Sequence, residues 1–374
     1  MAGLFALNMP TTNNVTGREV ILADTGLAGG AAPQSVGLGI NQIAPLCAPR
    51  NVIDGGDFTI NPFQRGTAFT GITNTPTYTA DRFFAVGGAS SSISVSYAAL
   101  AAGALAGFGG ALQFGRAAAN ADVTPIKLGQ VIETGDSIRL QGQPLVLSFY
   151  AIAGANLSAG GSNITVSVFS GTGTNQSAAS MIAGTWTGQA TVATQVISIV
   201  PTVWGARYTV VIPAIASNVM QLGIVFQYTP VGTAGAADYI QITGIQMEPG
   251  AAPSQFERLD IQVALEIAQR YCWVLAEPAA AVVTGAGMNT TAAIQVFYIA
   301  LPVQMVKAPT VTVVSAGTFK TNQAGTQTAT TVTAGTTHTV NAISINGNSS
   351  GVAGQATLLS GGGGAGQIVV SADF

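Results

Sequence analysis

The sequence has few charged residues. Lys and Arg number 12 and Asp and Glu number 15 among 374 residues, so 7% of the chain is charged, where soluble domains have about 25%. Twelve basic residues spread along the chain cannot form the dense positive surface that neutralises a nucleic-acid backbone. We therefore expect no nucleic-acid partner.

Histidine and cysteine are also scarce. The two cysteines, Cys47 and Cys272, lie far apart without a CxxC spacing, and the one histidine, His338, lies in a threonine-rich tract. A zinc site or a Ser-His-Asp triad needs partners that the sequence does not place nearby. We expect a surface histidine, and no metal or redox role for the cysteines.

Two pairs of carboxylates are close in sequence. Asp54 and Asp57 flank a diglycine turn, and Glu133 and Asp136 lie in a second turn-like stretch. A glycosidase needs two carboxylates that face each other across the substrate, roughly 5–9.5 Å apart, whereas solvated turn carboxylates explain both pairs here. The sequence predicts no catalytic residue and no enzyme.

Long, strongly hydrophobic runs are absent as well. The nearly uncharged stretch 98–112 is built of small residues and is shorter than the ~20 apolar residues of a membrane span. We expect it to be a surface or loop-rich segment, without membrane insertion. The N-terminus lacks the basic region of a secretory signal, so none is predicted.

Glycine, alanine, threonine and asparagine are abundant, above all near the N-terminus, where prolines recur at Pro10, Pro33, Pro45 and Pro49. Such a segment cannot bury enough apolar side chain to fold alone. We expect residues 1–50 to form an extended anchoring arm that orders on another subunit or a larger assembly. A disordered tail is the alternative.

Residues 51–258 alternate apolar and polar positions in short runs between Gly, Asn, Ser and Pro clusters, which is typical of an all-β fold. The runs 92–97, 145–152, 164–169, 191–200 and 208–212 have the length of strands. We expect a jelly-roll-like β-sandwich. Residues 259–275 then switch to a helical spacing of apolar residues, with Asp260 as N-cap, and predict a linker helix.

Residues 276–374 predict a second, small β-sandwich. Strand-like runs recur at 293–301, 309–314, 328–333, 339–345 and 367–371, and only Lys307, Lys320 and Asp373 are charged after Glu277. The run Gly361 to Gly364 lies between two β-like stretches, so we expect a flexible hairpin tip there. A phosphate-binding loop would need a following helix.

Two stretches carry recognisable motifs. The first reads NVIDGGDFTINPFQRGT from Asn51, followed by YTADRF from Tyr78, and the second runs from ITGIQMEPG at Ile242 to QRYCW at Gln269. They resemble the tail-fibre and related virion structural proteins of tailed bacteriophages, whose modules show NxxxNGDFxxxQRGT, YTADRW, QLExGxxATPFExR and QRYY in this order. The residues that match these motifs are Asp57, Phe58, Gln64, Arg65, Gly66, Asp81, Arg82, Glu248, Phe256, Glu257 and Arg258.

The matching residues also have plain structural interpretations. Phe58 and Ile60 would alternate toward one face of a strand, and Asp81 with Arg82 would form a local ion pair. Residues 256–258 would supply the core anchor and the exposed charged pair of the last strand. The sequence departs from the family at Phe83, where the family has Trp, so an aromatic platform for sugar is not expected at that position.

The resemblance also suggests ligands. The opening motif is similar to the first strand of carbohydrate-binding jelly rolls, which often hold a structural calcium, and Asp57 and Glu248 would be its candidate ligands; no other cofactor is implied. Sugar recognition needs aromatic faces flanked by hydrogen-bonding groups. The candidate platforms are Trp186 and Trp204, which lie in loop-like sequence, although core packing is an alternative for both.

The resemblance implies a virion structural protein of the tail-fibre type, located in the virion and attached to other virion proteins through residues 1–50. It would mediate attachment to a host-surface glycan. Family fibres commonly form homotrimers, and low charge is typical of such obligate interfaces. Two alternatives stay open: a capsid decoration or head-fibre protein without dedicated receptor binding, and a secreted carbohydrate-binding module.

Overall fold

The computed structural model describes residues 19–24, 35–39, 50–58, 64–80, 82–89, 93–205, 207–315, 318–323 and 326–374. The chain divides into two compact units, Met1–Arg50 and Asn51–Phe374. In the first unit, β1 (Glu19–Asp24) and β2 (Ser35–Gly39) pair as antiparallel strands. Cys47 and the four prolines lie outside the described residues.

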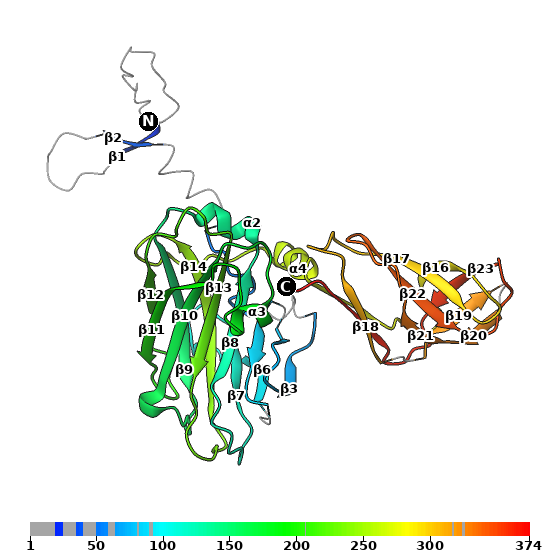
Figure 1. The fold of residues 1–374 in the computed structure, drawn as a ribbon, viewed down its shortest axis with the longest axis horizontal. Coiled ribbons are helices and arrows are strands. Elements are labelled where there is room, and N and C mark those ends of the chain that lie inside the picture. The colour runs from blue at the N-terminus through cyan, green and yellow to red at the C-terminus, as the bar shows by residue number, and fades with distance from the viewer. Residues whose placement is uncertain are drawn as a thin grey trace, which may run out of the picture. The chain divides into compact units, whose positions relative to one another are not determined.

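Two six-stranded antiparallel sheets form the first sandwich (Figure 1). Sheet I has the order β12-β9-β14-β7-β6-β3 and consists of β12 (Tyr208–Ile212), β9 (Leu145–Ala153), β14 (Tyr239–Pro249), β7 (Gly110–Arg116), β6 (Ile93–Ala99) and β3 (Ala68–Ile72). Sheet II has the order β11-β10-β13-β8-β5-β4 and consists of β11 (Ala190–Ser198), β10 (Asn163–Gly171), β13 (Gln221–Tyr228), β8 (Ile126–Ile132), β5 (Phe84–Val86) and β4 (Thr77–Tyr78).

Alternating side chains from both sheets build one core. Along β10, Ile164, Val166 and Val168 are buried between half-buried polar neighbours. Phe149 of sheet I meets Phe226 of sheet II with ring centroids 5.0 Å apart. The all-β prediction is therefore confirmed, because a period of two buries one face of each sheet.

Short helical turns join the strands of this sandwich. They are α2 (Thr134–Ser137), η1 (Ile138–Leu140), η2 (Gly160–Ser162) and α3 (Ala178–Ile182). The stretch 98–112, expected to be rich in loop, contains the end of β6 and the start of β7 as well as the connection between them. No helix in the described part of the chain is long and apolar enough to cross a membrane.

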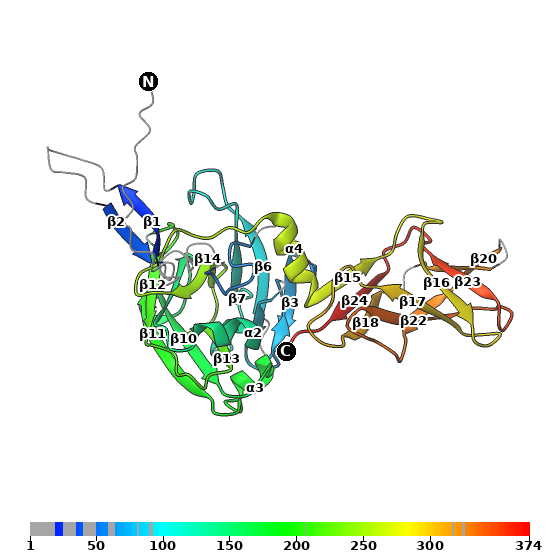
Figure 2. The same cartoon turned by 90° about the horizontal axis from the view of Figure 1, so that it is seen from above.

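The predicted linker helix is present as α4 (Ile261–Gln269), and Asp260 caps it, because its Oδ1 accepts from the backbone N–H of Gln262 at 2.9 Å. The helix is shorter than the predicted 259–275, because residues 272–275 pair with another strand instead. In both cartoon views α4 lies beside β15 (Cys272–Ala276), the first strand of the C-terminal module (Figure 2). The helix therefore ends where the second β-structure begins.

A three-stranded and a seven-stranded sheet form the C-terminal module. The first has the order β15-β24-β18, with β24 (Gln367–Ser371) and β18 (Thr310–Ser315). The second has the order β20-β19-β23-β16-β17-β22-β21, with β20 (Thr326–Ala329), β19 (Lys320–Gln323), β23 (Ala356–Ser360), β16 (Val283–Asn289), β17 (Gln295–Ala300), β22 (Ala342–Asn348) and β21 (Thr331–Ala334). Phe297 and Ile343 of the larger sheet share one core with Ile368 and Val370 of the smaller one.

The run Gly361 to Gly364 is not a hairpin tip. It connects β23, in the seven-stranded sheet, with β24, in the three-stranded sheet, so the two flanking strands do not pair with each other. The prediction of a hairpin assumed that two consecutive strands pair with each other. A sequence pattern shows where strands occur but not which sheet each strand joins.

The C-terminal residues contact the first sandwich. Phe374 packs with Tyr271, and its main-chain oxygen accepts from the Tyr78 hydroxyl at 2.9 Å and from the Ala178 N–H at 3.1 Å. Arg65 forms an ion pair with Asp373. These contacts tie the end of the chain to β4 and α3.

Candidate functional site

The opening motif, residues 51–58, lies along β14. Val52 donates its N–H to the Met247 carbonyl at 3.0 Å, and Ile245 donates to the Gly56 carbonyl at 2.9 Å. A Cβ on Gly56 would lie 2.1 Å from the Ile245 oxygen, so only glycine allows this close approach. Phe58 is not in a strand as expected: it has a φ of +50° and packs on Phe83 at 5.1 Å, and Ile60 lies outside the described residues.

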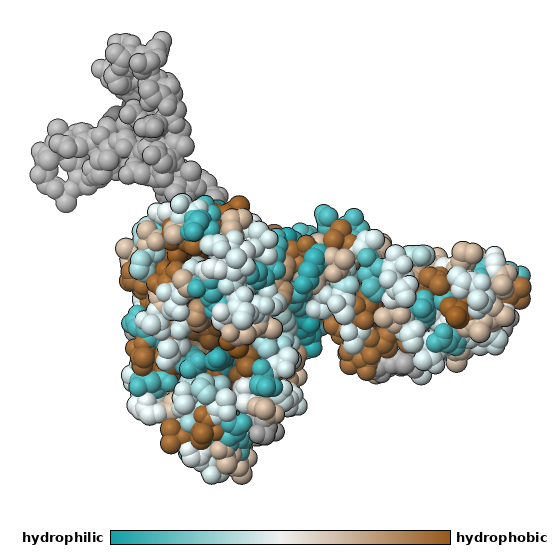
Figure 3. Space-filling model, in the orientation of Figure 1, coloured by the Kyte–Doolittle hydropathy of each residue, from teal (hydrophilic) through white to brown (hydrophobic). Residues whose placement is uncertain are grey.

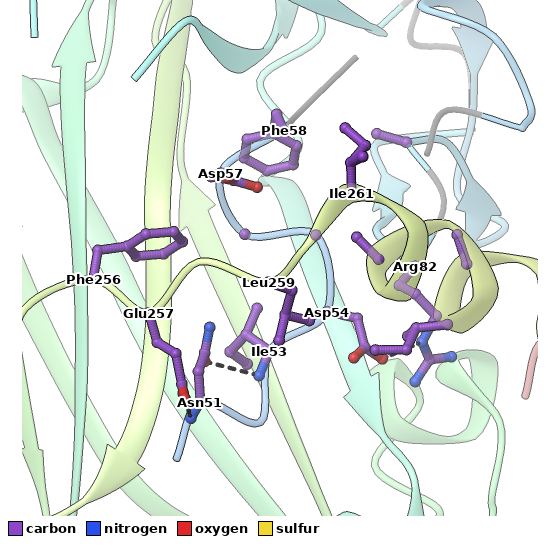
Figure 4. Close-up of a pocket in the computed structure, with 16 residues that line it drawn as sticks. Asn51, Ile53, Asp54, Asp57, Phe58, Arg82, Phe256, Glu257, Leu259 and Ile261 are labelled. Atoms are coloured by element: carbon purple, nitrogen blue, oxygen red, sulfur yellow. Dashed lines mark hydrogen bonds and ion pairs between the residues drawn. The ribbon is translucent and has the colours of Figure 1, made fainter. Parts of the chain in front are cut away.

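Some of the motif residues, Asp57, Phe58, Arg82, Phe256 and Glu257, line a small cavity (Figure 4). The opening motif, α4 and the residues Phe256, Glu257 and Leu259 line it, and its volume is about 60 Å³. That space holds a few water molecules, each of which needs roughly 10–15 Å³ by this measure, whereas small-molecule pockets reach about 300–1,000 Å³. The cavity is therefore too small for a sugar ring.

Arg82 lines this cavity and is 2% exposed. It donates from Nε to Asp54 Oδ2 at 3.1 Å and from Nη2 to the Val131 carbonyl at 2.6 Å, and it stacks on the Tyr271 ring at 3.5 Å. The expected partner, Asp81, lies outside the described residues. Burial raises the pKa of the Asp54 carboxyl above its usual value, although Arg82 opposes this.

The closing motif fastens the segment after β14 to the opening motif. Arg258 donates to Asp57 Oδ2 at 3.2 Å and lies over the Phe108 ring at 4.8 Å, while Glu257 accepts from the Asn51 N–H at 2.8 Å. Residues 256–258 were expected in the last strand, but they follow β14. They form a segment that crosses over the opening motif and is bonded to it. Phe256 packs edge-on against Phe108 at 5.2 Å.

Arg65, Gly66 and Gln64 lie at the other end of the opening motif. Besides its ion pair with Asp373, Arg65 donates to the Ser371 hydroxyl at 3.2 Å. Gly66 has a φ of +107°, which disfavours a side chain there, and Gln64 is half-buried. Arg65 thus connects the segment before β3 to the C-terminal residues.

The two calcium candidates belong to separate networks. Asp57 pairs with Arg258, whereas Glu248 is 1% exposed and accepts from Gln246 Nε2 at 2.7 Å and from the Ser254 N–H and hydroxyl at 2.7 and 2.6 Å. Across the described residues, no three His, Cys, Asp or Glu side chains cluster as metal ligands. Protein donors thus occupy both carboxylates.

Arg116 occupies a ligand set of the type that a hard cation would use. Its guanidinium donates to the carbonyls of Asn120, Asp122 and Gly232 at 3.1, 2.7 and 2.9 Å and to Asp238 Oδ2 at 2.6 Å. Both side chains of the pair are fully buried. Carbonyl and carboxylate oxygens are the ligands that Ca²⁺ prefers, but here an internal arginine fills the site.

The glycine-rich run near the C-terminus binds an anion that belongs to the chain itself. The Glu277 carboxylate accepts from the N–H groups of Gly362, Gly364 and Gly366 at 2.8, 3.1 and 2.9 Å, and from the N–H and hydroxyl of Thr318. Burial raises the pKa of Glu277, but these donors outweigh it and lower the pKa to about 2. Glu277 therefore fills the position that a phosphate would take.

The remaining sequence candidates have structural partners. Glu133 accepts from Arg270 Nη2 and the Tyr271 hydroxyl at 3.1 and 2.6 Å, and Asp136 pairs with Arg139 at 3.3 Å. The two carboxylates thus neutralise neighbours, which disfavours a catalytic role.

Of the two alternatives for Trp186, a sugar platform or core packing, the structure supports core packing, because the indole is buried. It is 3% exposed, and its Nε1 donates to the Ser177 carbonyl at 2.9 Å. It packs with Met181 and Phe84 over the outward side of sheet II, where a sugar cannot reach its ring. Trp204 is half-buried and stays a prediction.

An uncharged band on the outward face of sheet I was not found from the sequence. Since Ile240, Ile242, Leu112 and Phe114 face the core, their strand neighbours Tyr239, Gln241 and Gln113 face outward. Gln241 pairs in register with Gln113 and with Ile152, and Gln113 pairs with Ser96. We call Tyr239, Gln241, Gln113, Ser96 and Tyr150 the tyrosine–glutamine band.

The geometry of this band leaves its polar groups and rings half-exposed. Gln241 Nε2 donates to Gln113 Oε1 at 2.9 Å, which orients both amides. A Cβ on Gly154 would lie 3.1 Å from Tyr239 Cε2, so the Tyr239 ring lies close to the main chain of Gly154, the residue that follows β9. The band thus combines aromatic rings with oriented amides. None of its five side chains is charged, but Arg207 interacts electrostatically with Tyr150, and Phe108 packs against the Tyr150 ring at 5.4 Å.

Comparisons with known proteins give limited similarity. No family model matches the sequence, and no curated protein is similar enough to match it. Among solved structures the chain is similar to TmCBM61 in complex with β-1,4-galactotriose, with 12% identity, a TM-score of 0.32, and coverage of 54% of this chain and 100% of that one.

Two further solved structures show the same degree of similarity. For the C-terminal family 22 carbohydrate-binding module of Clostridium thermocellum Xyn10B the identity is 13%, the TM-score 0.28 and the coverage 48% and 98%. For an apo cyclase from Fischerella sp. these values are 10%, 0.31, 55% and 98%. At such scores the similarity supports no conclusion about what this chain binds or catalyses.

Proposed function

We propose that this chain is a bacteriophage virion structural protein of the tail-fibre type that binds a host-surface glycan through the tyrosine–glutamine band. The band is the observation that carries the glycan-binding proposal. A sugar packs its C–H face on an aromatic ring, while its hydroxyl groups exchange hydrogen bonds with amides.

The virion assignment rests on the motif residues. The opening and closing motifs, far apart in sequence, contact each other through Asn51 with Glu257 and Asp57 with Arg258. Each motif supplies the bonding partners of the other, which explains why the two motifs occur in the same chain. In this proposal, residues 1–50 attach the chain to other virion proteins.

The position of the chain on the particle distinguishes a tail fibre from a capsid decoration protein. We expect antibody against the C-terminal module to label purified particles at the tail end in electron micrographs. Label over the head would instead support the decoration protein, and particles without label would contradict both.

Replacing Tyr239 by alanine should weaken binding to the host-surface polysaccharide at least about tenfold, because it removes the ring on which a sugar would pack. Titration calorimetry with purified polysaccharide measures this effect. Tyr239→Phe keeps the ring and should bind within about threefold of the wild-type protein.

A matched control separates the band from the rest of the surface. Gln195→Ala removes an exposed amide from β11, in the other sheet, and should leave affinity unchanged, whereas Gln241→Ala should weaken it. Equal affinity of the wild-type protein, Tyr239→Ala and Gln241→Ala, all folded by circular dichroism, would refute the band as the binding site.

A further inference from the structure

Arg207 lies at the edge of the tyrosine–glutamine band. It directly precedes β12, whose first residue, Tyr208, pairs in register with Phe149. One further step along this antiparallel pair places Arg207 opposite Tyr150. Because Phe149 faces the core, its neighbour Tyr150 faces outward, and Arg207 lies on the same face. The electrostatic interaction between Arg207 and Tyr150 agrees with this placement.

The guanidinium of Arg207 is only partly satisfied. Its Nη1 donates to the Ser254 carbonyl, but its Nε and Nη2 are buried and have no hydrogen-bond partner in the described part of the chain. A buried donor without an acceptor costs free energy. These two donors therefore favour an acceptor that a ligand or water supplies.

The other arginines of the chain show what this edge of a guanidinium binds. Six arginines form ion pairs with carboxylates in the described part of the chain: Arg65, Arg82, Arg116, Arg139, Arg258 and Arg270. In the Arg116 pair, Nε and Nη2 both donate to Asp238 Oδ2, at 2.8 and 2.6 Å. The same two atoms are the unpartnered ones in Arg207. Together they form a planar fork that matches the two oxygens of a carboxylate.

Glu248 does not take the place of such a carboxylate. It interacts electrostatically with Arg207, but it is 1% exposed and accepts from Gln246 and Ser254. Burial lowers the pKa of the Arg207 guanidinium, and the interactions with Tyr150 and Glu248 do not outweigh this effect. A further anion would therefore stabilise the charge of Arg207.

Little else on the first sandwich would attract an anion to the band. The chain has a formal net charge of −3, and on the face shown in Figure 3 hydrophilic residues lie in separate areas among neutral and hydrophobic ones. Arg258 lies over Phe108, which packs on Tyr150, but Arg258 is paired with Asp57. Without a strong positive field over the surface, recognition of an anion depends on a local contact.

We infer that the glycan bound by the tyrosine–glutamine band is acidic and that Arg207 binds its carboxylate. This inference rests on the proposed glycan binding by the band. The carboxylate of a uronic acid is attached directly to the sugar ring, and residues opposite each other on adjacent strands lie about 4.5–5.5 Å apart. A ring packed on Tyr150 thus brings its carboxylate to Arg207. Because Nε and Nη2 are covered, the half-buried side chain has to rotate toward the surface on binding.

Chemical reduction of the carboxylates tests the inference. The purified host-surface polysaccharide is compared with the same polysaccharide after carbodiimide-activated reduction, which converts each carboxylate into a neutral hydroxymethyl group. By titration calorimetry, we expect the wild-type protein to bind the reduced sample at least about tenfold more weakly, because the charge-assisted hydrogen bonds to Arg207 are lost.

Variants of Arg207 assign this effect to one side chain. Arg207→Gln should bind the native polysaccharide at least about tenfold more weakly and the reduced one as well as the wild-type protein does, which also shows that the variant is folded. Arg207→Lys keeps the charge without the fork and should recover only part of the affinity. Arg139→Gln removes an exposed arginine outside the band and, as the matched control, should leave both affinities unchanged.

Equal binding of the native and the reduced polysaccharide by the wild-type protein would overturn the inference, as would an equal loss with both samples in Arg207→Gln. If Tyr239→Ala still weakens binding in that case, the band binds a glycan and only the role of Arg207 is wrong. A wild-type protein that binds neither sample would refute glycan binding by the band and the inference together.

Discussion

Replacing Arg116 by methionine should destabilise the first sandwich by about 3–5 kcal/mol, the cost of removing one partner from a buried ion pair. The Asp238 carboxylate would lose its cation in a fully buried position. The carbonyls of Asn120, Asp122 and Gly232 would lose a donor at the same time. Urea unfolding followed by tryptophan fluorescence measures the change.

Arg139→Met is the control for the loss of an arginine. Arg139 pairs with Asp136 at 3.3 Å, but the two side chains are 41% and 38% exposed, so the loss should stay below about 1 kcal/mol. Arg116→Lys should not restore stability, since one ammonium group cannot reach the acceptors that the planar guanidinium serves. A loss below about 1 kcal/mol in Arg116→Met would contradict the structural role of the pair.

The sequence predicts the all-β fold class because local physics determines it. The run 208–212 coincides with β12, and the alternation in 164–169 lies within β10. The spacing of apolar residues and the cap at Asp260 likewise predicted α4. Such patterns depend on neighbouring residues only, so no knowledge of the partner strands is needed.

Contacts between distant residues could not be predicted in this way. Arg116 and Asp238 are separated by 122 positions, and Glu277 and Gly366 by 89. The tyrosine–glutamine band depends on β14 lying between β9 and β7, which no local pattern shows. The sequence motifs indicated residues that matter, but their role is mainly to fasten one segment to another.

The position of Trp186 shows why an aromatic residue in a loop-like sequence is a poor guide to a binding surface. A Cβ on Gly171 would lie 3.0 Å from Trp186 Cε3, and one on Gly223 would lie 3.1 Å from its Cη2. The two glycines on the outward side of β10 and β13 therefore make room for the indole. The residues that indicate burial of Trp186 are these glycines of β10 and β13, and not the residues next to the tryptophan in sequence.

Replacing Trp186 by alanine should therefore cost about 3–5 kcal/mol of stability, as expected for a buried tryptophan, and should leave the glycan affinity of the folded protein unchanged. The variant loses its packing against Met181 and Phe84 and leaves the Ser177 carbonyl without the indole donor. Trp186→Phe keeps most of the packing and should lose less. Thermal unfolding measures the stability of each variant, and titration calorimetry at low temperature measures its glycan affinity. A Trp186→Ala variant that is as stable as the wild-type protein but no longer binds glycan would contradict this prediction and show that the indole is a ligand platform.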